Sequence, residues 1–228
     1  MCTDGHVLLC EPSSVLDDSW RALYTSAFPE SEREPEEKLQ QLINEGRLLL
    51  HKTIGKNGEL LCFSMVSLAS NFAFLAYIAV DPMQRSGGYG SKHMKALIER
   101  LKSDYPEHLG MVLEIESTHP RHSELSPDET AIRARRFGFY KRLGFKRLCR
   151  SMEYIVPNRT GEGVQELDVL FLAYLAPVIG HASKSMVVEE ILQRFYLLDA
   201  QDTLLTKVLS SICSCSHGQC DEEQAPAA

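Results

Sequence analysis

The chain has 228 residues, of which 44% are hydrophobic and 24% are charged. These proportions are ordinary for a globular protein and exclude a wholly disordered chain, a fibrous rod and a membrane bundle. The length supports one large domain or one domain with an addition. With 24 Lys and Arg against 31 Asp and Glu, the net charge is −7, which argues against binding of nucleic acid through its phosphates.

The N-terminal segment MCTDGHVLLCEPSS has neither the basic start nor the long apolar run of a signal peptide. No stretch reaches the roughly 18 to 20 apolar residues of a membrane span. The seven cysteines are an odd number, and without a secretion signal we expect free thiols. These features predict a cytoplasmic protein without a membrane partner.

Three cysteines and a histidine lie close together near the C-terminus, at Cys213, Cys215, His217 and Cys220. Such side chains are soft metal ligands, but a short segment without a flanking fold makes a poor structural zinc site. We therefore expect no metal, and lipidation or plain disorder of this tail are the alternatives.

In the first half of the chain, apolar periodicity and turn residues predict a strand at 6–11, helices at 15–28 and 35–45, and strands at 47–54, 59–69 and 72–80. Ser14 is the expected N-cap of the first helix, and PESEREPEE (29–37) is an expected polar loop. The strand FAFLAYIAV is apolar at successive positions, so we expect it to be covered on both faces.

The second half predicts a helix at 90–102, a strand at 111–117, a polar loop at 118–128, a basic helix at 129–143, strands at 145–156 and 164–173, and helices at 186–198 and 202–212. The remaining residues, 213–228, are expected to be disordered. This order predicts an α/β (α+β) fold, with one mixed sheet flanked by helices.

The turn between the strand 72–80 and the helix 90–102 is the most informative segment, because Arg85 to Gly90 fit the pattern R-x-x-G-x-G. Glycines let the backbone approach a ligand closely, and the first turn of a helix offers unpaired N–H groups and partial positive charge. With the Arg85 cation and the hydroxyls of Ser86 and Ser91, the turn predicts a pyrophosphate site. The alternative is a Gly-rich turn that only starts a helix. The spacing of Arg85, Gly88 and Gly90 fits neither a P-loop nor the G-x-G-x-x-G motif that binds dinucleotides.

Two carboxylates, Glu114 and Glu116, lie two positions apart on the strand 111–117 and therefore point to one face of it. Burial and mutual repulsion would raise the pKa of at least one, which suits a general base. The alternatives are a strand end where both reach solvent, or a pair with an arginine.

The helix 129–143 carries five basic residues, Arg133, Arg135, Arg136, Lys141 and Arg142. It is either a solvated basic face, with Ala134, Phe137 and Phe139 in the core, or a short nucleic-acid patch. Because the chain is net acidic, we expect no nucleic-acid partner.

The order of elements, the run YIAVDPMQRSGGYGS and the later FYKRLGF (139–145) resemble the GNAT superfamily of acetyl-CoA-dependent N-acetyltransferases. The resemblance covers about residues 5–175. It implies a largely antiparallel, twisted sheet flanked by helices, with a splayed parallel pair formed by the fourth and fifth strands. The expected organisation is a GNAT-like domain at 1–175, added helices at 176–212 packed on it, and the tail at 213–228.

The resemblance also implies roles for individual residues. Acetyl-CoA would be the co-substrate, and its expected contacts are Ile78, Ala79, Val80, Arg85, Ser86, Gly87, Gly88, Tyr89, Gly90, Ser91, Arg133 and Phe137. Arg133 stands where many members have Asn. The expected catalytic residues are Tyr140, as proton donor to the coenzyme sulfur, and Glu114 or Glu116 as base. The loop with Phe28, Glu32 and Arg33 would line the acceptor site.

The implied activity is transfer of an acetyl group from acetyl-CoA to a primary amine, on a small molecule or a peptide. The acidic loop would concentrate a polyamine-like or lysine-like amine, whereas Arg33 would instead grip the carboxylate of an amino acid. A catalytically silent acyl-CoA-binding or sensor module on the same fold is the alternative function. A homodimer is a further possibility.

Overall fold

The computed structural model describes residues 7–121, 124–158, 163–175 and 179–212. Outside them lie Cys2 and the C-terminal cluster of Cys213, Cys215, His217 and Cys220. The chain divides into two compact units, Met1–Met111 (the first unit) and Val112–Ala228 (the second unit).

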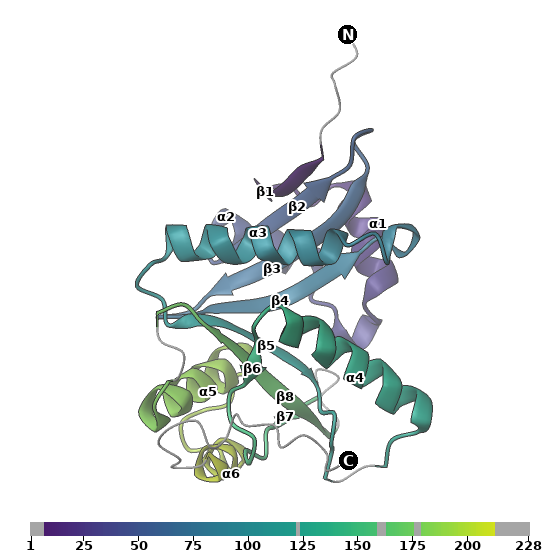
Figure 1. Ribbon diagram of the computed structural model, residues 1–228. Helices are drawn as coiled ribbons and strands as arrows, with labels where there is room; N and C mark the ends of the chain where they lie inside the picture. The colour runs from purple at the N-terminus through teal and green to yellow at the C-terminus, as the bar shows by residue number, and fades with distance from the viewer. Residues whose placement is uncertain (1–6, 122–123, 159–162, 176–178, 213–228) are drawn as a thin grey trace. The chain divides into compact units, whose positions relative to one another are not determined.

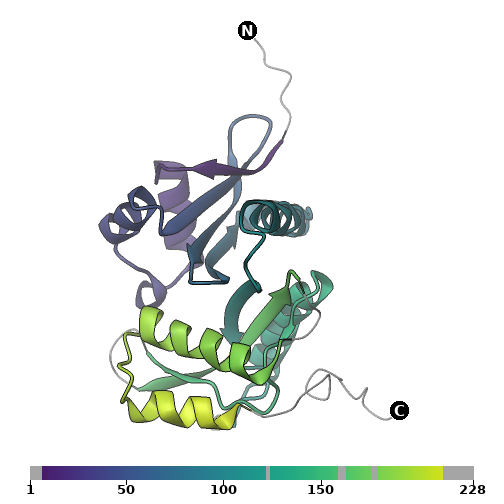
Figure 2. The same ribbon diagram turned by 90° about the vertical axis from the view of Figure 1, so that its left-hand side faces the viewer.

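The first unit is built on four antiparallel strands in chain order (Figure 1). They are β1 (Leu8–Ser13), β2 (Leu48–Ile54), β3 (Leu60–Leu68) and β4 (Ala73–Val80). Helices α1 (Asp18–Ala27) and α2 (Glu36–Asn44) cover one face of these strands, and α3 (Tyr89–Asp104) covers the other (Figure 2). The expectation that the strand 72–80 is covered on both faces is confirmed.

The core under α1 and α2 is aromatic. Trp20 is fully buried and stacks on Tyr24 at a centroid distance of 4.7 Å, and Phe63 of β3 packs against both rings. Burial of side chains this large is the main source of stability for such a face.

The start of α1 differs from the expectation that Ser14 caps it. Asp17 is the N-cap, because its carboxylate accepts the backbone N–H of Trp20 at 2.9 Å. Burial opposes ionisation of Asp17, but hydrogen bonds from Lys52, Ser19 and the Trp20 backbone outweigh it and hold its pKa at about 2.

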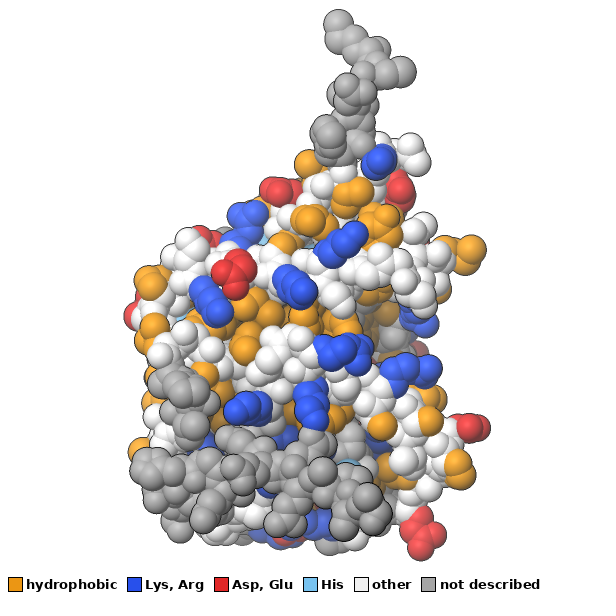
Figure 3. Space-filling model, in the orientation of Figure 1, with side chains coloured by type: hydrophobic (Ala, Val, Ile, Leu, Met, Phe, Trp, Pro, Cys, Tyr) orange, Lys and Arg blue, Asp and Glu red, His pale blue; other side chains and the backbone are white. Residues whose placement is uncertain are grey.

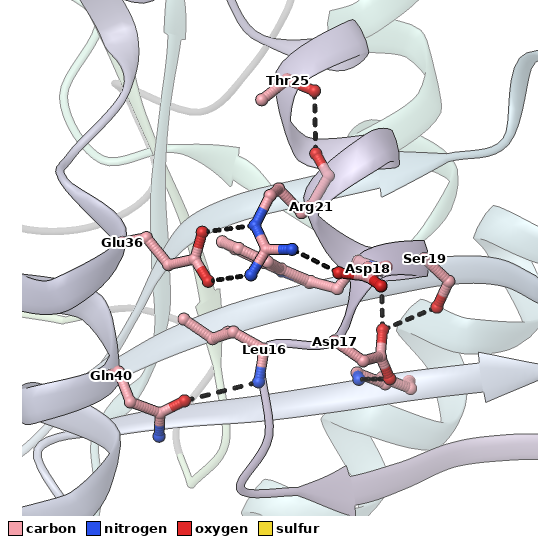
Figure 4. Close-up of polar contacts among 10 residues, drawn as sticks. Leu16, Asp17, Asp18, Ser19, Arg21, Thr25, Glu36 and Gln40 are labelled. Atoms are coloured by element: carbon pink, nitrogen blue, oxygen red, sulfur yellow. Dashed lines mark hydrogen bonds and ion pairs between the residues drawn. The ribbon is translucent and has the colours of Figure 1, made fainter.

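Arg21 of α1 binds Glu36 with two hydrogen bonds of 2.7 and 2.6 Å, which ties α1 to α2 (Figure 4).

The second unit contains the greater part of β5 (Gly110–Glu116), followed by α4 (Pro127–Arg142), β6 (Lys146–Arg147), β7 (Ile155–Pro157) and β8 (Val164–Ala173). Strand β8 pairs antiparallel with both β6 and β7. Helices α5 (His181–Phe195) and α6 (Thr203–Ser211) lie side by side (Figures 1 and 2).

The expected single strand at 145–156 is wrong. β6 pairs with residues 170–171 of β8, whereas β7 pairs with residues 164–166 at the other end of it, so two short strands replace the single one expected. The expected splay between the fourth and fifth strands stays a prediction, because the division between the two units falls within β5.

Candidate functional site

The loop after β4 has the conformation that a phosphate-binding turn needs. Ser86 and Gly88 both have positive φ angles, of 66° and 76°, and Gly88 is the left-handed N-cap of α3 without a side-chain cap. The first backbone bond of the helix runs from Lys92 N–H to the Gly88 carbonyl. The N–H groups of Tyr89, Gly90 and Ser91 precede this bond, so the helix itself supplies no acceptor for them.

Two amides of this loop take part in the turn itself. The Arg85 N–H donates to the Pro82 carbonyl at 3.5 Å, and the Gly87 N–H donates to the Gln84 carbonyl at 3.3 Å. A Cβ added at Gly87 would lie 3.1 Å from the Tyr89 ring, whereas one added at Gly88 would meet nothing within 4 Å. The loop is therefore open at Gly88 and closely packed at Gly87.

Strand β4 is irregular where it approaches this loop. Tyr77 pairs with Met65 and Leu75 pairs with Val66, so Ala76 is an extra residue and forms a β-bulge. Bulges redirect a strand and are frequent next to active sites. Ile78, Ala79 and Val80, the expected coenzyme contacts, follow the bulge and pair with β3.

A basic residue that the sequence analysis did not select stands beside the loop. Lys92 lies on the exposed face of α3, with its ammonium 5.6 Å from the centre of the Tyr89 ring. Lys and Arg side chains gather over this helix (Figure 3). Such side chains favour an anionic ligand at the helix N-terminus.

The loop between α1 and α2 is fastened by two phenols. The Tyr77 hydroxyl donates to the Glu32 carbonyl at 2.9 Å, and the Tyr24 hydroxyl accepts the Glu34 N–H at 2.9 Å. Phe28 packs edge-on against Tyr77 at 5.0 Å. The expected acceptor-side residues Phe28, Glu32 and Arg33 therefore stand on a fixed loop.

The charges of this loop are partly neutralised. Glu36 pairs with Arg21 and Glu34 pairs with Lys38, which weakens the expected attraction for a cationic amine. The Nε of Arg33 is buried, and among the residues that the structure describes it has no hydrogen-bond partner.

In the second unit, Glu116 does not behave as the expected general base. It forms an ion pair with Arg136 of α4. Burial raises the pKa of Glu116, but the hydrogen bond and the positive charge of Arg136 outweigh burial and leave this pKa below its ordinary value. The pairing with an arginine, one of the alternatives from sequence, is the arrangement observed.

Glu114 lies in a different environment on the same strand. The hydroxyl of Tyr154 donates to its Oε1, and the hydroxyl of Tyr196 donates to its Oε2 at 2.7 Å. Sequence reasoning missed both tyrosines, since they are 40 and 82 residues away along the chain and nothing local marks them.

Tyr140, the expected proton donor, is a buried residue of α4. Its ring packs edge-on against Phe139 and Phe145, with centroids 5.0 and 5.7 Å apart. Its carbonyl also accepts the N–H groups of Leu143 and Phe145, which ends the helix.

Arg133 and Phe137, the expected coenzyme contacts of α4, contact other residues of the second unit. The Arg133 guanidinium donates to the Ser117 carbonyl at 2.8 Å, and the Phe137 ring lies 4.1 Å from the Arg147 guanidinium carbon. Arg147 in turn pairs with Asp168 of β8 at 3.1 Å. These contacts connect α4 to the end of β5 and to β8.

The three cysteines within the described residues, Cys10, Cys62 and Cys149, are free thiols, as expected. Within the described part of the chain, no cluster of His, Cys, Asp or Glu is arranged to hold a metal ion. No helix in that part combines the length and the apolar character needed to cross a membrane.

Residues 17–123 match the family model described as Acetyltransferase (GNAT) family. This segment is therefore similar to a GNAT-family acetyltransferase domain, and the expected α/β fold class is confirmed. No curated protein sequence matches the chain.

Solved structures share this fold at low sequence identity. A putative GNAT-family acetyltransferase from Bacteroides thetaiotaomicron is 20% identical, with a TM-score of 0.58, and the match covers 78% of this chain and 90% of that one. The ribosomal-protein-S18-alanine N-acetyltransferase from Escherichia coli is also 20% identical, with a TM-score of 0.50 and coverage of 73% and 94%. Arabidopsis thaliana NAA60, solved in complex with acetyl-CoA, is 13% identical, with a TM-score of 0.52 and coverage of 74% and 98%.

Proposed function

We propose that the protein is an N-acetyltransferase that moves an acetyl group from acetyl-CoA to a primary amine of a small molecule or a peptide. The observation that carries the proposal is the uncapped N-terminus of α3, which follows a bulged strand and a left-handed glycine loop. Oriented N–H groups at such a position bind phosphate oxygens.

On the coenzyme side, the N–H groups from Gly88 to Ser91 bind the pyrophosphate, and Arg85 and Lys92 add positive charge. The backbone of residues 78–80, beyond the bulge, binds the pantetheine arm. A backbone N–H near Val80 stabilises the oxyanion that forms on the thioester carbonyl.

On the proton-transfer side, Glu114 takes a proton from the ammonium group of the acceptor, directly or through water. The neutral amine then attacks the thioester carbonyl, a C–N bond forms and the C–S bond breaks. Tyr140 gives its phenolic proton to the departing thiolate and regains one from the new amide nitrogen through water. The balance is an ammonium ion plus acetyl-CoA giving an amide, free coenzyme A and one proton released from Glu114.

Release of coenzyme A with a panel of amines tests this function. The panel contains a polyamine, a lysine peptide and an amino acid, and free thiol is followed with a thiol-reactive dye. We expect acetyl-CoA-dependent thiol release with at least one class. Tight acetyl-CoA binding without turnover on any amine would instead identify a silent acyl-CoA-binding module.

The glycine loop offers a test with a matched control. Gly88 and Gly58 both have left-handed φ angles, and neither has an atom within 4 Å of an added Cβ. An alanine at either position costs about 1 to 2 kcal/mol of backbone strain. Gly58 lies in the turn between β2 and β3. Titration calorimetry should show about tenfold weaker acetyl-CoA binding in Gly88→Ala and unchanged binding in Gly58→Ala. Equal binding in the two variants would refute the role of the loop.

A further inference from the structure

The carboxylate of Glu114 is held from two sides within the second unit. Tyr154, which precedes β7, donates its hydroxyl to Oε1, and Tyr196, at the C-cap of α5, donates to Oε2 at 2.7 Å. Hydrogen bonds from two different segments fix the rotation of a carboxylate better than one does, and bonds to a charged acceptor are the stronger ones.

The two phenols alone do not use all the acceptor capacity of a carboxylate. A carboxylate offers about four lone-pair sites, and each hydroxyl donates to a different oxygen of Glu114. Burial, and next the charge of Glu114, raise the pKa of Tyr154 well above its ordinary value. Tyr154 therefore stays a hydrogen-bond donor at neutral pH.

Tyr196 belongs to the C-terminal helices, which follow the region that resembles the GNAT superfamily. Val187, Val188, Ile191 and Leu192 of α5 are fully buried, and the Leu198 N–H donates to the Leu192 carbonyl at 3.2 Å. Helix α5 therefore holds the end that carries Tyr196 in a fixed place.

The backbone directly after Tyr196 is strained. Leu197 has a φ angle of 57°, although it is not glycine, and the residue is 82% exposed. A bulky residue in the left-handed region is a rare outlier, and the exposed leucine gains little burial in return. Strain of this kind persists where the surrounding structure holds the chain in place and is concentrated at functional sites.

Helix α6 fastens the other phenol. The backbone N–H of Glu153 donates to the Ser211 hydroxyl at 2.9 Å, and the Glu153 carboxylate pairs with Lys207 at 2.9 Å. Glu153 immediately precedes Tyr154, so α6 fixes the chain at the point where this hydroxyl reaches Glu114.

We propose that Tyr196 is a positioning residue for the acetyl transfer, which holds the Glu114 carboxylate in the orientation that accepts the proton of the amine. The helices α5 and α6 are then part of the catalytic apparatus. This inference rests on the proposed role of Glu114 as the base.

The test compares two substitutions that each remove one hydroxyl. Tyr196→Phe removes the hydroxyl that contacts Glu114. Tyr105→Phe, the control, removes the hydroxyl of a tyrosine in the first unit that stacks on His108. We expect about tenfold lower kcat in Tyr196→Phe with an unchanged KM for acetyl-CoA, because misplacement of a catalytic group affects turnover and not coenzyme binding. The melting temperature should stay close to that of the parent protein. Tyr105→Phe should keep the parent kcat.

A spectroscopic readout accompanies the kinetics. With ¹³C-labelled glutamate, the carboxyl resonance of Glu114 is assigned by its loss in Glu114→Gln. It should move in Tyr196→Phe and not in Tyr105→Phe. A parent enzyme that is active, with unchanged kcat and an unmoved Glu114 resonance in Tyr196→Phe, would overturn the positioning role and leave the acetyltransferase function standing. A parent protein that acetylates no amine of the panel would overturn the function and this role together.

Discussion

Each unit buries a polar cluster, and the two clusters differ in what they leave accessible. In the first unit, His93 is fully buried, and its ring nitrogens lie 2.8 Å from the hydroxyls of Thr53 and Ser64. In the second unit, Glu114 is half-buried and lies between two phenols. Both clusters satisfy the rule that buried polar groups find partners.

The two clusters differ in charge and in exposure. Burial lowers the pKa of His93 to about 3, so the imidazole is neutral at pH 7, and each of its nitrogens already faces a hydroxyl. Glu114 is only half-buried, and a carboxylate can accept more than two hydrogen bonds. Burial of polar side chains therefore does not by itself identify a functional site. A half-buried group that can exchange a proton, such as the Glu114 carboxylate, is the better candidate.

The largest effect should come from removing the carboxylate. Glu114→Gln keeps the size of the side chain but cannot take a proton, and general base catalysis contributes about 10² to 10⁴ in rate. We expect kcat to fall at least about 100-fold, with acetyl-CoA affinity unchanged by calorimetry.

Glu116→Gln is the companion variant on the same strand. Its carboxylate is paired with Arg136 and its pKa is held below the ordinary value, so it is a poor base and its loss should cost less turnover. Full turnover in both variants across pH would remove the carboxylates from the mechanism.

Tyr140→Phe should have the next largest effect. The ring contacts with Phe139 and Phe145 and the bonds of the Tyr140 carbonyl do not need the hydroxyl, so the variant should fold normally. Loss of a proton donor to the thiolate predicts at least about tenfold lower kcat with an acetyl-CoA Kd within about twofold. Unchanged turnover would show that Tyr140 serves only the core.

Much of the fold follows from local patterns. The strand–turn–helix segment around Gly88 lies as predicted, because glycine, the helix start and the apolar strand are all local signals. The capping box of α4, between Ser126 and Glu129, is also a local sequence pattern, although the helix was expected to begin only at residue 129. The division of the expected strand 145–156 depends instead on its partner β8, which local composition does not reveal.

The candidate site was only partly predictable for the same reason. Glu114 stands out as a charged residue in an apolar strand, so one sequence suffices to select it. Tyr196 lies at the end of an ordinary amphipathic helix, and its role depends on a contact with a residue 82 positions earlier. Arg136 was noted only as part of a basic face, although it decides the pKa of Glu116.

The smallest predicted effect is on stability, and it tests whether the buried histidines of the first unit are neutral. Burial lowers the pKa of His93 to about 3 and that of His51 to about 4, whereas an unfolded histidine titrates near 6.5. Below pH 6.5 the unfolded chain binds protons that the folded chain does not. The contribution of these two histidines to stability is therefore fully present above this pH and is lost as the pH falls toward 4 and 3. Each histidine contributes at most about 1.4 kcal/mol per pH unit.

Trp20, the single tryptophan of the chain, is buried in the first unit, so its fluorescence reports unfolding of the unit that holds both histidines. Urea unfolding followed in this way should show a midpoint that decreases from pH 6.5 to 4.5. In His93→Gln, a non-titrating side chain faces Thr53 and Ser64, and the decrease should be about half as steep, because one of the two depressed histidines is gone. His181→Gln, at an exposed position at the start of α5, should keep the parent slope. An undiminished slope in His93→Gln would mean that groups other than His93 control the acid stability of the first unit. It would also contradict the neutral state of His93, on which the comparison with Glu114 depends.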